Sequence, residues 1–165
     1  MSDTLTANLG RGIFNTPLLR LKFPSIQILA SSCSVSIPDP VNLEPIKEGD
    51  LPLVGQPHAA EELFNLELTG CDGSNARVNL KLEGTTEPGY PAVLKSTGGA
   101  SGVGIQVLNK NDNSNPITFG DEVVVGNTGG ASTYRIPLAA RYFRVAEEDV
   151  RGTVSATAAF SVTLN

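Results

Sequence analysis

Residues 151–165, RGTVSATAAFSVTLN, decide the fold because their apolar side chains recur on every second position. The apolar row consists of Val154, Ala156, Ala158, Phe160, Val162 and Leu164. A period of two is typical of a β-strand with one buried and one wet face, whereas a helix repeats its apolar stripe every three or four residues. A strand with an unpaired edge is a template for aggregation. This segment therefore needs a neighbour on each edge, and no further strand follows it in the sequence.

Similar short segments, separated by turn signals, recur along the rest of the chain. The composition agrees with a turn-rich β protein, with 17 Gly, 11 Pro and no Trp. Only residues 59–63, AAEEL, have the pattern of a helical turn. Many short strands at this spacing predict an all-β antiparallel sandwich or barrel. The predicted extended segments are 16–37, 41–43, 51–53, 62–71, 76–84, 90–96, 102–110, 117–120, 121–127 and 132–145.

Length and charge narrow the class of protein. A chain of 165 residues is long enough for one domain with a substantial core. The formal net charge of −5, without any cluster of Lys or Arg, argues against a nucleic-acid partner. No run of eighteen apolar residues is present to span a membrane, and MSDTLTANLG lacks the basic and apolar regions of a signal peptide.

The two cysteines, Cys33 and Cys71, are interpreted as a structural disulfide. Neither lies in a C-x-x-C pair, and the single histidine, His58, cannot complete a four-ligand zinc site with two distant thiols. A bridge between them would stabilise the fold by roughly 4 kcal/mol in the chain-entropy model. It also implies an oxidising compartment such as the periplasm or the cell surface. The alternative is a pair of buried free thiols in a cytosolic protein.

The remaining motifs predict structure rather than chemistry. The stretch 98–104, GGASGVG, lacks the lysine of a phosphate-binding loop and has no helical pattern after it, so we expect a turn that leads into a strand. His58 lies in the loop GQPHAAEE, where a solvated surface imidazole is expected. The stretch 109–115, NKNDNSN, lacks the glycine and glutamate of an EF-hand and predicts a hairpin turn. We expect no enzyme, metal site or cofactor.

Several motifs of the last third occur in an order that resembles a known family. They are GVGIQVLNKNDNSNPITFGD (102–121), PLAARYFRV (137–145) and VRGTVSATAAFSVTLN (150–165). Together they resemble the pilins of chaperone–usher fimbriae, of the type 1 and P pilus kind. The resemblance covers residues 18–165, including the positions of Cys33 and Cys71, which match the family's disulfide. Gly152 matches a family glycine fourteen residues from the C-terminus, whereas Leu164 stands where the family has a penultimate tyrosine.

The resemblance implies an incomplete immunoglobulin-like sandwich that lacks its last strand, with a hydrophobic groove beside the final strand. A periplasmic chaperone would fill the groove first, and the N-terminal extension of the next subunit would replace it at the outer-membrane usher, by strand addition. The apolar row of residues 154–164 would line one side of the groove, and Gly152 and Leu164 would contact the chaperone. Residues of the first strand would line the other side, namely Leu19, Leu21, Phe23, Ile26 and Ile28.

The N-terminal residues 1–17 are expected to form an extension to a pilin domain that spans residues 18–165. Family donor strands carry a glycine on the inward row, whereas Gly10 and Gly12 fall on the other row here. The alternatives are a linker left after an adhesin domain and an engineered complement. A donor strand is favoured by one alternating row, formed by Leu5, Ala7, Leu9 and Ile13.

We therefore expect a structural subunit of a chaperone–usher fimbria on the bacterial surface, which polymerises by donor-strand exchange and supports cell adhesion. Its partners would be neighbouring subunits, the chaperone and the usher, with no nucleic acid and no membrane insertion. The alternatives are the pilin domain of a two-domain tip adhesin and a sandwich-type receptor- or carbohydrate-binding module. A carbohydrate site would favour exposed aromatic side chains, but Tyr134 and Tyr142 are predicted to share a buried row.

Overall fold

The computed structural model describes residues 5–9, 26–29, 33–36, 39–50, 52–148 and 151–165, and these form an all-β fold. Within this part of the chain the only helical element is a 3-10 turn, η1 (Glu48–Asp50), so no helix is long and apolar enough to cross a membrane. The strands are β1 (Leu5–Leu9), β2 (Ile26–Leu29), β3 (Ser34–Ser36), β4 (Glu62–Thr69), β5 (Arg77–Glu83), β6 (Thr86–Glu87), β7 (Tyr90–Leu94), β8 (Val103–Asn109), β9 (Asn115–Pro116), β10 (Glu122–Asn127), β11 (Thr133–Arg144), β12 (Gly152–Ala156) and β13 (Ala159–Leu164).

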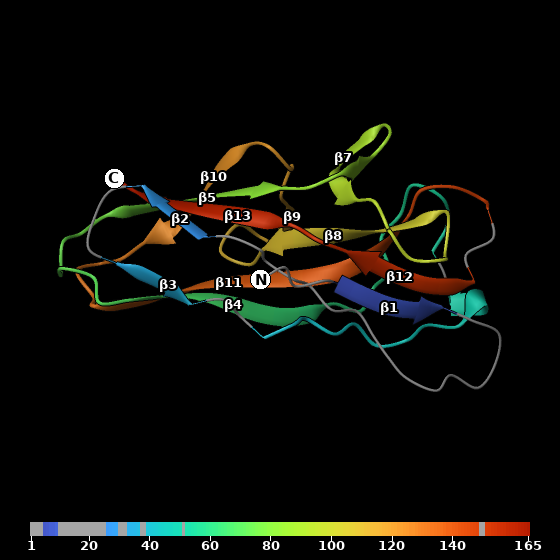
Figure 1. Cartoon of the computed structure of the whole chain (residues 1–165), viewed down its shortest axis with the longest axis horizontal. Helices are drawn as coiled ribbons and strands as arrows, with labels where there is room; N and C mark the ends of the chain where they lie inside the picture. Colours follow the sequence, from blue (N-terminus) through green and yellow to red (C-terminus); the bar gives the residue numbers. More distant parts are fainter. Residues whose placement is uncertain (1–4, 10–25, 30–32, 37–38, 51, 149–150) are drawn as a thin grey trace.

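The strands form two main sheets and one small ribbon (Figure 1). The larger sheet has the order β3-β4-β11-β8-β7-β6, with β9 paired to β8, and its long antiparallel centre is β4, β11 and β8. The smaller sheet has the order β10-β5-β13-β2, in which only β13 and β2 run parallel. The ribbon consists of β1 and β12. Most sheet neighbours are therefore antiparallel, as the spacing of the strand patterns predicted.

Side chains of both sheets meet in one hydrophobic core. Leu66 and Leu68 of β4 and Leu80 and Leu82 of β5 have no exposed surface, and all four belong to the same cluster of buried residues. These residues lie on the alternating rows of 62–71 and 76–84, so the period of two identified the inward face of both strands. At about 1.5–3 kcal/mol for each large apolar side chain removed from water, such rows supply most of the drive to fold.

Two local predictions were wrong, and one segment expected to be extended is buried outside the sheets. Residues 59–61 are irregular and Glu62 already begins β4, so no helical turn forms at 59–63; the helical turn is η1 instead. Residues 117–120 form no strand, because the hairpin after β8 returns only through the two residues of β9. Residues 41–43 also form no strand, although Val41 and Leu43 are buried and anchor the long β3–β4 connection to the core.

Two turn predictions are confirmed. Residues 98–102 form an irregular turn that leads into β8, as expected for GGASGVG. Residues 110–114 close the β8–β9 hairpin, in which Asn109 pairs with Asn115. Asn113 and Ser114 there have positive φ values of 48° and 59°, a conformation that asparagine tolerates well in turns.

Cys33 and Cys71 form a disulfide across 38 residues, so the alternative of two free thiols does not hold. Cys33 immediately precedes β3 and Cys71 lies two residues after β4, and Ser34 pairs with Thr69. The bridge therefore fastens the short edge strand β3 to the sheet, where only a few residues hold it by hydrogen bonds.

Replacing both cysteines by alanine is expected to lower the free energy of unfolding by roughly 4 kcal/mol, since the unfolded chain regains the entropy of an open loop. Guanidinium unfolding of the oxidised protein and of the Cys33→Ala/Cys71→Ala variant measures the difference. The chemically reduced wild type is the matched control and should unfold close to the double variant. Equal stability of all three forms would contradict a structural role for the bridge.

Candidate strand-complementation site

The amphipathic segment that ends the sequence is divided into two strands, β12 and β13, which run one after the other along the molecule (Figure 1). The division falls at Thr157 and Ala158, where Thr157 is exposed and Ala158 is buried. The apolar row continues through the division, since Val154, Ala156, Ala158, Phe160, Val162 and Leu164 are each at most 8% exposed. One face of the segment is therefore buried along its whole length, although its neighbours change at the division.

Strand β13 has a neighbour on each edge. On one edge it pairs antiparallel with β5, from Ala159 opposite Glu83 to Leu164 opposite Val78. On the other edge it pairs parallel with β2, which places Phe160 opposite Ile26. This parallel pairing places residues 26–29 against the last described strand.

Strand β12 pairs on one edge with β1. The pairing is antiparallel, and its register places Leu5 opposite Ala156, Ala7 opposite Val154, and Leu9 opposite Gly152. The partner strand thus comes from the opposite end of the sequence. Leu5, Ala7 and Leu9 are three of the four residues predicted for a donor strand.

The other edge of β12 is covered by the Gly-rich segment 96–100. The Thr97 amide donates to the Ser155 carbonyl (2.6 Å), and the Ala100 amide donates to the Thr153 carbonyl (3.0 Å). The Ser155 amide in turn donates to Ser96 Oγ (3.1 Å). Because successive residues of a strand direct their backbone groups to opposite edges, Val154 and Ala156 direct theirs towards β1.

Two glycines allow this close packing. A Cβ atom on Gly98 would lie 1.9 Å from the Thr153 carbonyl oxygen, so no side chain fits between the segment and β12. Gly152 has a φ of +126°, and a Cβ atom there would lie 3.0 Å from the Ala100 amide nitrogen. The structure therefore gives Gly152, identified only through the family resemblance, a physical role in seating residues 99–100.

The predicted site residues are brought together in part. Ile26 and Ile28 lie in β2 directly beside β13, with no strand between them. Leu19, Leu21, Phe23 and Ile13 lie outside the described residues. Sequence patterns did not identify segment 96–100 as a neighbour of β12. The only signal was the run of glycines at 98, 99 and 102, which was interpreted as a turn.

The aromatic residues bear on the carbohydrate alternative. Tyr142 is buried at 2% exposure, as its row predicted, whereas Tyr134 is only half-buried. The Tyr134 hydroxyl donates to the Val125 carbonyl (3.2 Å), and burial raises the pKa of this phenol. Neither ring offers the exposed platform on which a sugar would stack.

Comparison with known proteins places the chain in a family. A family model described as "Fimbrial protein" matches residues 25–165, which include β2 to β13. The chain belongs to the fimbrial protein family. The resemblance found in the sequence is thereby confirmed, and the chain is a pilin, a structural subunit that associates with other subunits of a pilus. The family is a structural one, not an enzymatic one.

Solved structures support the same fold. A chaperone–usher pilus structure concerned with rod uncoiling matches with a TM-score of 0.63 and 19% identity, over 94% of this chain and 95% of that one. The P pilus rod subunit PapA matches with a TM-score of 0.54 and 18% identity, over 83% of this chain and 94% of that one. The Burkholderia pseudomallei antigen and type I fimbria protein BPSL1626 matches with a TM-score of 0.54 and 22% identity, over 100% of this chain and 99% of that one. No curated protein sequence matches the chain. The expected immunoglobulin-like pilin sandwich is confirmed.

The packing of segment 96–100 on β12 can be tested with two neighbouring glycines. Gly98→Ala is expected to destabilise the protein by about 1–3 kcal/mol, because the new methyl group collides with the β12 backbone. Gly99→Ala is the matched control, since a Cβ atom there meets nothing within 4 Å. Thermal unfolding followed by circular dichroism measures both variants. Equal melting temperatures would show that the segment does not lie against β12.

Proposed function

We propose that this fimbrial protein is a subunit of a chaperone–usher fimbria and polymerises by donor-strand exchange. The observation that carries the proposal is the pairing of β1 with β12, because this edge of β12 is covered by five residues from the far end of the sequence. The backbone ladder depends only on strand direction and register. The same five residues from another copy of the chain would therefore make the same hydrogen bonds with β12.

The length of the connection supports exchange between subunits. Residues 10–25 separate β1 from β2, and sixteen residues of extended chain reach at most roughly 55 Å. A globular domain of this size is about 40 Å across. A strand on such a tether can reach its own β12 or that of a neighbouring subunit. Intramolecular pairing is favoured at low concentration, and exchange is favoured once subunits are held close together.

We assign residues 1–17 to the donor extension and residues 18–165 to the pilin domain. The donor row would be Leu5, Ala7, Leu9 and Ile13. The accepting groove would be lined by the apolar row of β12 and β13 and by the first-strand residues from Leu19 to Ile28. Because β2 pairs directly with β13 in this conformation, a donated strand that runs the full length of the groove requires β2 to separate from β13.

The proposed assembly pathway uses the same edge twice. A periplasmic chaperone would cover it first, with contacts at Gly152 and Leu164, and the outer-membrane usher would catalyse the replacement by the next subunit. Leu164 lies at the end of β13 with 8% exposure, where a strand added beside β13 would pass. The mature protein would then reside in a fimbria at the bacterial surface, where it supports adhesion.

Size-exclusion chromatography with light scattering tests the proposal. The full chain is expected to form concentration-dependent oligomers, and a chain that starts at Thr16 is expected to lose them and to bind a synthetic peptide of residues 1–15. Monomers of both forms at every concentration, without peptide binding, would contradict donor-strand exchange.

Proline substitutions in β1 provide a matched pair for the same assay. Ala7→Pro removes an amide hydrogen that faces Val154, so it should weaken oligomers and peptide binding. Asn8→Pro removes an amide hydrogen that faces away from β12 and should have a smaller effect. Equal effects of the two substitutions would count against a β1–β12 ladder.

A further inference from the structure

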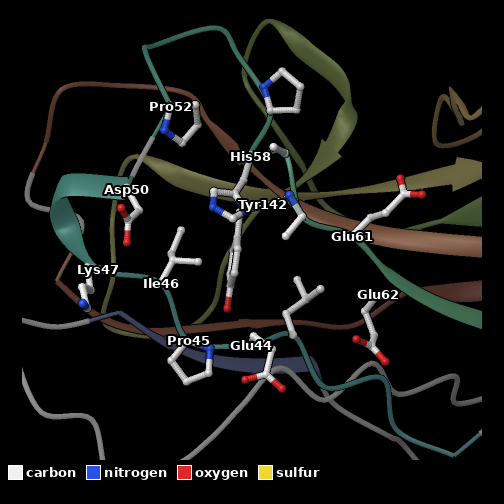
Figure 2. Close-up of a pocket in the computed structure, with 14 residues that line it drawn as sticks. Glu44, Pro45, Ile46, Lys47, Asp50, Pro52, His58, Glu61, Glu62 and Tyr142 are labelled. Carbon is white, nitrogen blue, oxygen red and sulfur yellow. Dashed lines mark hydrogen bonds between the residues drawn. The ribbon is translucent and has the colours of Figure 1, made fainter.

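A cavity of about 650 Å³ lies beside the paired strands β4 and β11, under the segment that connects β3 to β4 (Figure 2). Its described lining consists of residues 43–47, 50, 52 and 57–62, which precede and begin β4, and of Tyr142 of β11. Its volume falls in the range of small-molecule sites, which are apolar pockets with a few polar groups. Pro45 and Ile46 contribute apolar wall, and Glu44, His58 and Glu62 contribute polar groups.

The walls of the cavity are anchored to the β-sheet. The Gly55 amide donates to the Arg144 carbonyl (2.7 Å), and the His58 amide donates to the Tyr142 carbonyl (2.8 Å). Pro57 forms an isolated bridge with Phe143. On the opposite wall, Ile46 is 8% exposed and packs into the core. The cavity is therefore part of the folded structure and not a gap beside a loose loop.

Tyr142 carries an unsatisfied polar group at the floor of the cavity. Its side chain is 2% exposed, and its hydroxyl has no hydrogen-bond partner among the described residues. Figure 2 shows the Tyr142 oxygen on the side of the cavity that holds Glu44 and Pro45. Burial, with a smaller contribution from the Glu44 charge, raises the pKa of this phenol, so the hydroxyl stays protonated. A buried hydroxyl without a partner is rare in folded proteins.

His58 packs against the same ring. Its imidazole lies edge-on to the Tyr142 ring with 6.3 Å between ring centroids, and the residue is half-buried, so the expected solvated surface imidazole is only partly exposed. The Ala60 amide donates to His58 Nδ1 (3.2 Å), which fixes that nitrogen as an acceptor. In this arrangement His58 adds an aromatic wall to the cavity.

The charges around the cavity are mainly negative. Glu61 is paired with Lys110, which also donates to Ser114 Oγ (2.7 Å). This leaves the carboxylates of Glu44, Asp50 and Glu62, which are exposed, and a single lysine, Lys47.

We propose that this cavity binds an alkylammonium or alkylguanidinium cation. The hydrocarbon stem lies against Pro45, Ile46 and the Tyr142 ring, and the cationic end lies between Glu44 and Glu62. An N–H group of the cation donates to the Tyr142 oxygen, which gives that oxygen one hydrogen-bond partner and requires a small displacement of the covering side chains. Amphipathic cations suit such a site because their stems prefer apolar surface while their charges prefer carboxylates.

Two sources present this chemistry, a free amine and a lysine or arginine side chain of a second copy of the chain. Light scattering of the full-length Ala7→Pro variant, in which the donor-strand contacts are weakened, with and without 1,5-diaminopentane distinguishes them. If a side chain of another copy occupies the cavity, the amine lowers the mass of the oligomers. If a free amine is the ligand, the amine binds without a change in mass.

Calorimetric titration of the full chain with n-pentylammonium chloride tests the proposal. Saturable binding at one site is expected, together with much weaker binding of 1-pentanol, which has the same stem without the charge. Glu44→Gln/Glu62→Gln should weaken the ammonium affinity about tenfold, since hydrogen bonds to charged groups are the stronger ones. Glu122→Gln, an exposed carboxylate on β10 outside the cavity, is the matched control and should leave the affinity unchanged.

The Tyr142→Phe variant tests the role of the hydroxyl in binding separately from any role in stability. Because this hydroxyl has no partner among the described residues, the variant should melt no lower than the wild type while it binds n-pentylammonium several-fold more weakly. The proposal is overturned if 1-pentanol binds as tightly as the ammonium ion, if the glutamine variant retains full affinity, or if Tyr142→Phe binds as the wild type does. Binding of methyl glycosides in place of the amine would also overturn it.

Discussion

The backbone groups of the last apolar segment all require partners, and the arrangement of the neighbouring strands follows from this requirement. A buried amide or carbonyl without a partner costs about 1–3 kcal/mol, which is a large share of the stability of a single domain. The apolar row of residues 154–164 is buried, so the backbone beside it cannot rely on water. Strand β13 obtains its partners from β5 and β2, and β12 obtains them from segment 96–100 and from β1.

These neighbours differ in how firmly the chain holds them. Strand β5 belongs to the core, and segment 96–100 leads directly into β8 and is seated by Gly98 and Gly152. Among the described strands, β1 pairs only with β12 and β2 pairs only with β13. A strand held by one ladder can be exchanged at a lower cost than a strand that is paired on both edges, such as β5. The proposed exchange of β1 at this edge is consistent with that strand order.

The sequence pattern predicted which face of each strand is buried, but it did not predict which segments lie beside each strand. Apolar residues at every second position mark the inward side chains of residues 154–164 and of β5, because burial of one strand face is enough to produce this alternation. It cannot show that the last strand changes neighbours at Thr157, because that depends on segments far away in the sequence. The same applies to Gly98, whose role is set by the Thr153 carbonyl opposite it. The cavity at Tyr142 was missed because an irregular, proline-rich segment forms its walls and no periodic pattern describes such a segment.

Hydrogen exchange along β12 tests the central claim most directly. The amides of Val154 and Ala156 face β1, whereas the Ser155 amide donates to Ser96 Oγ. We predict that a chain starting at Thr16 loses protection at Val154 and Ala156 and keeps it at Ser155, and that a peptide of residues 1–15 restores it. Unchanged protection at Val154 and Ala156 after the truncation would contradict the account, because the N-terminal strand would then not complete this edge.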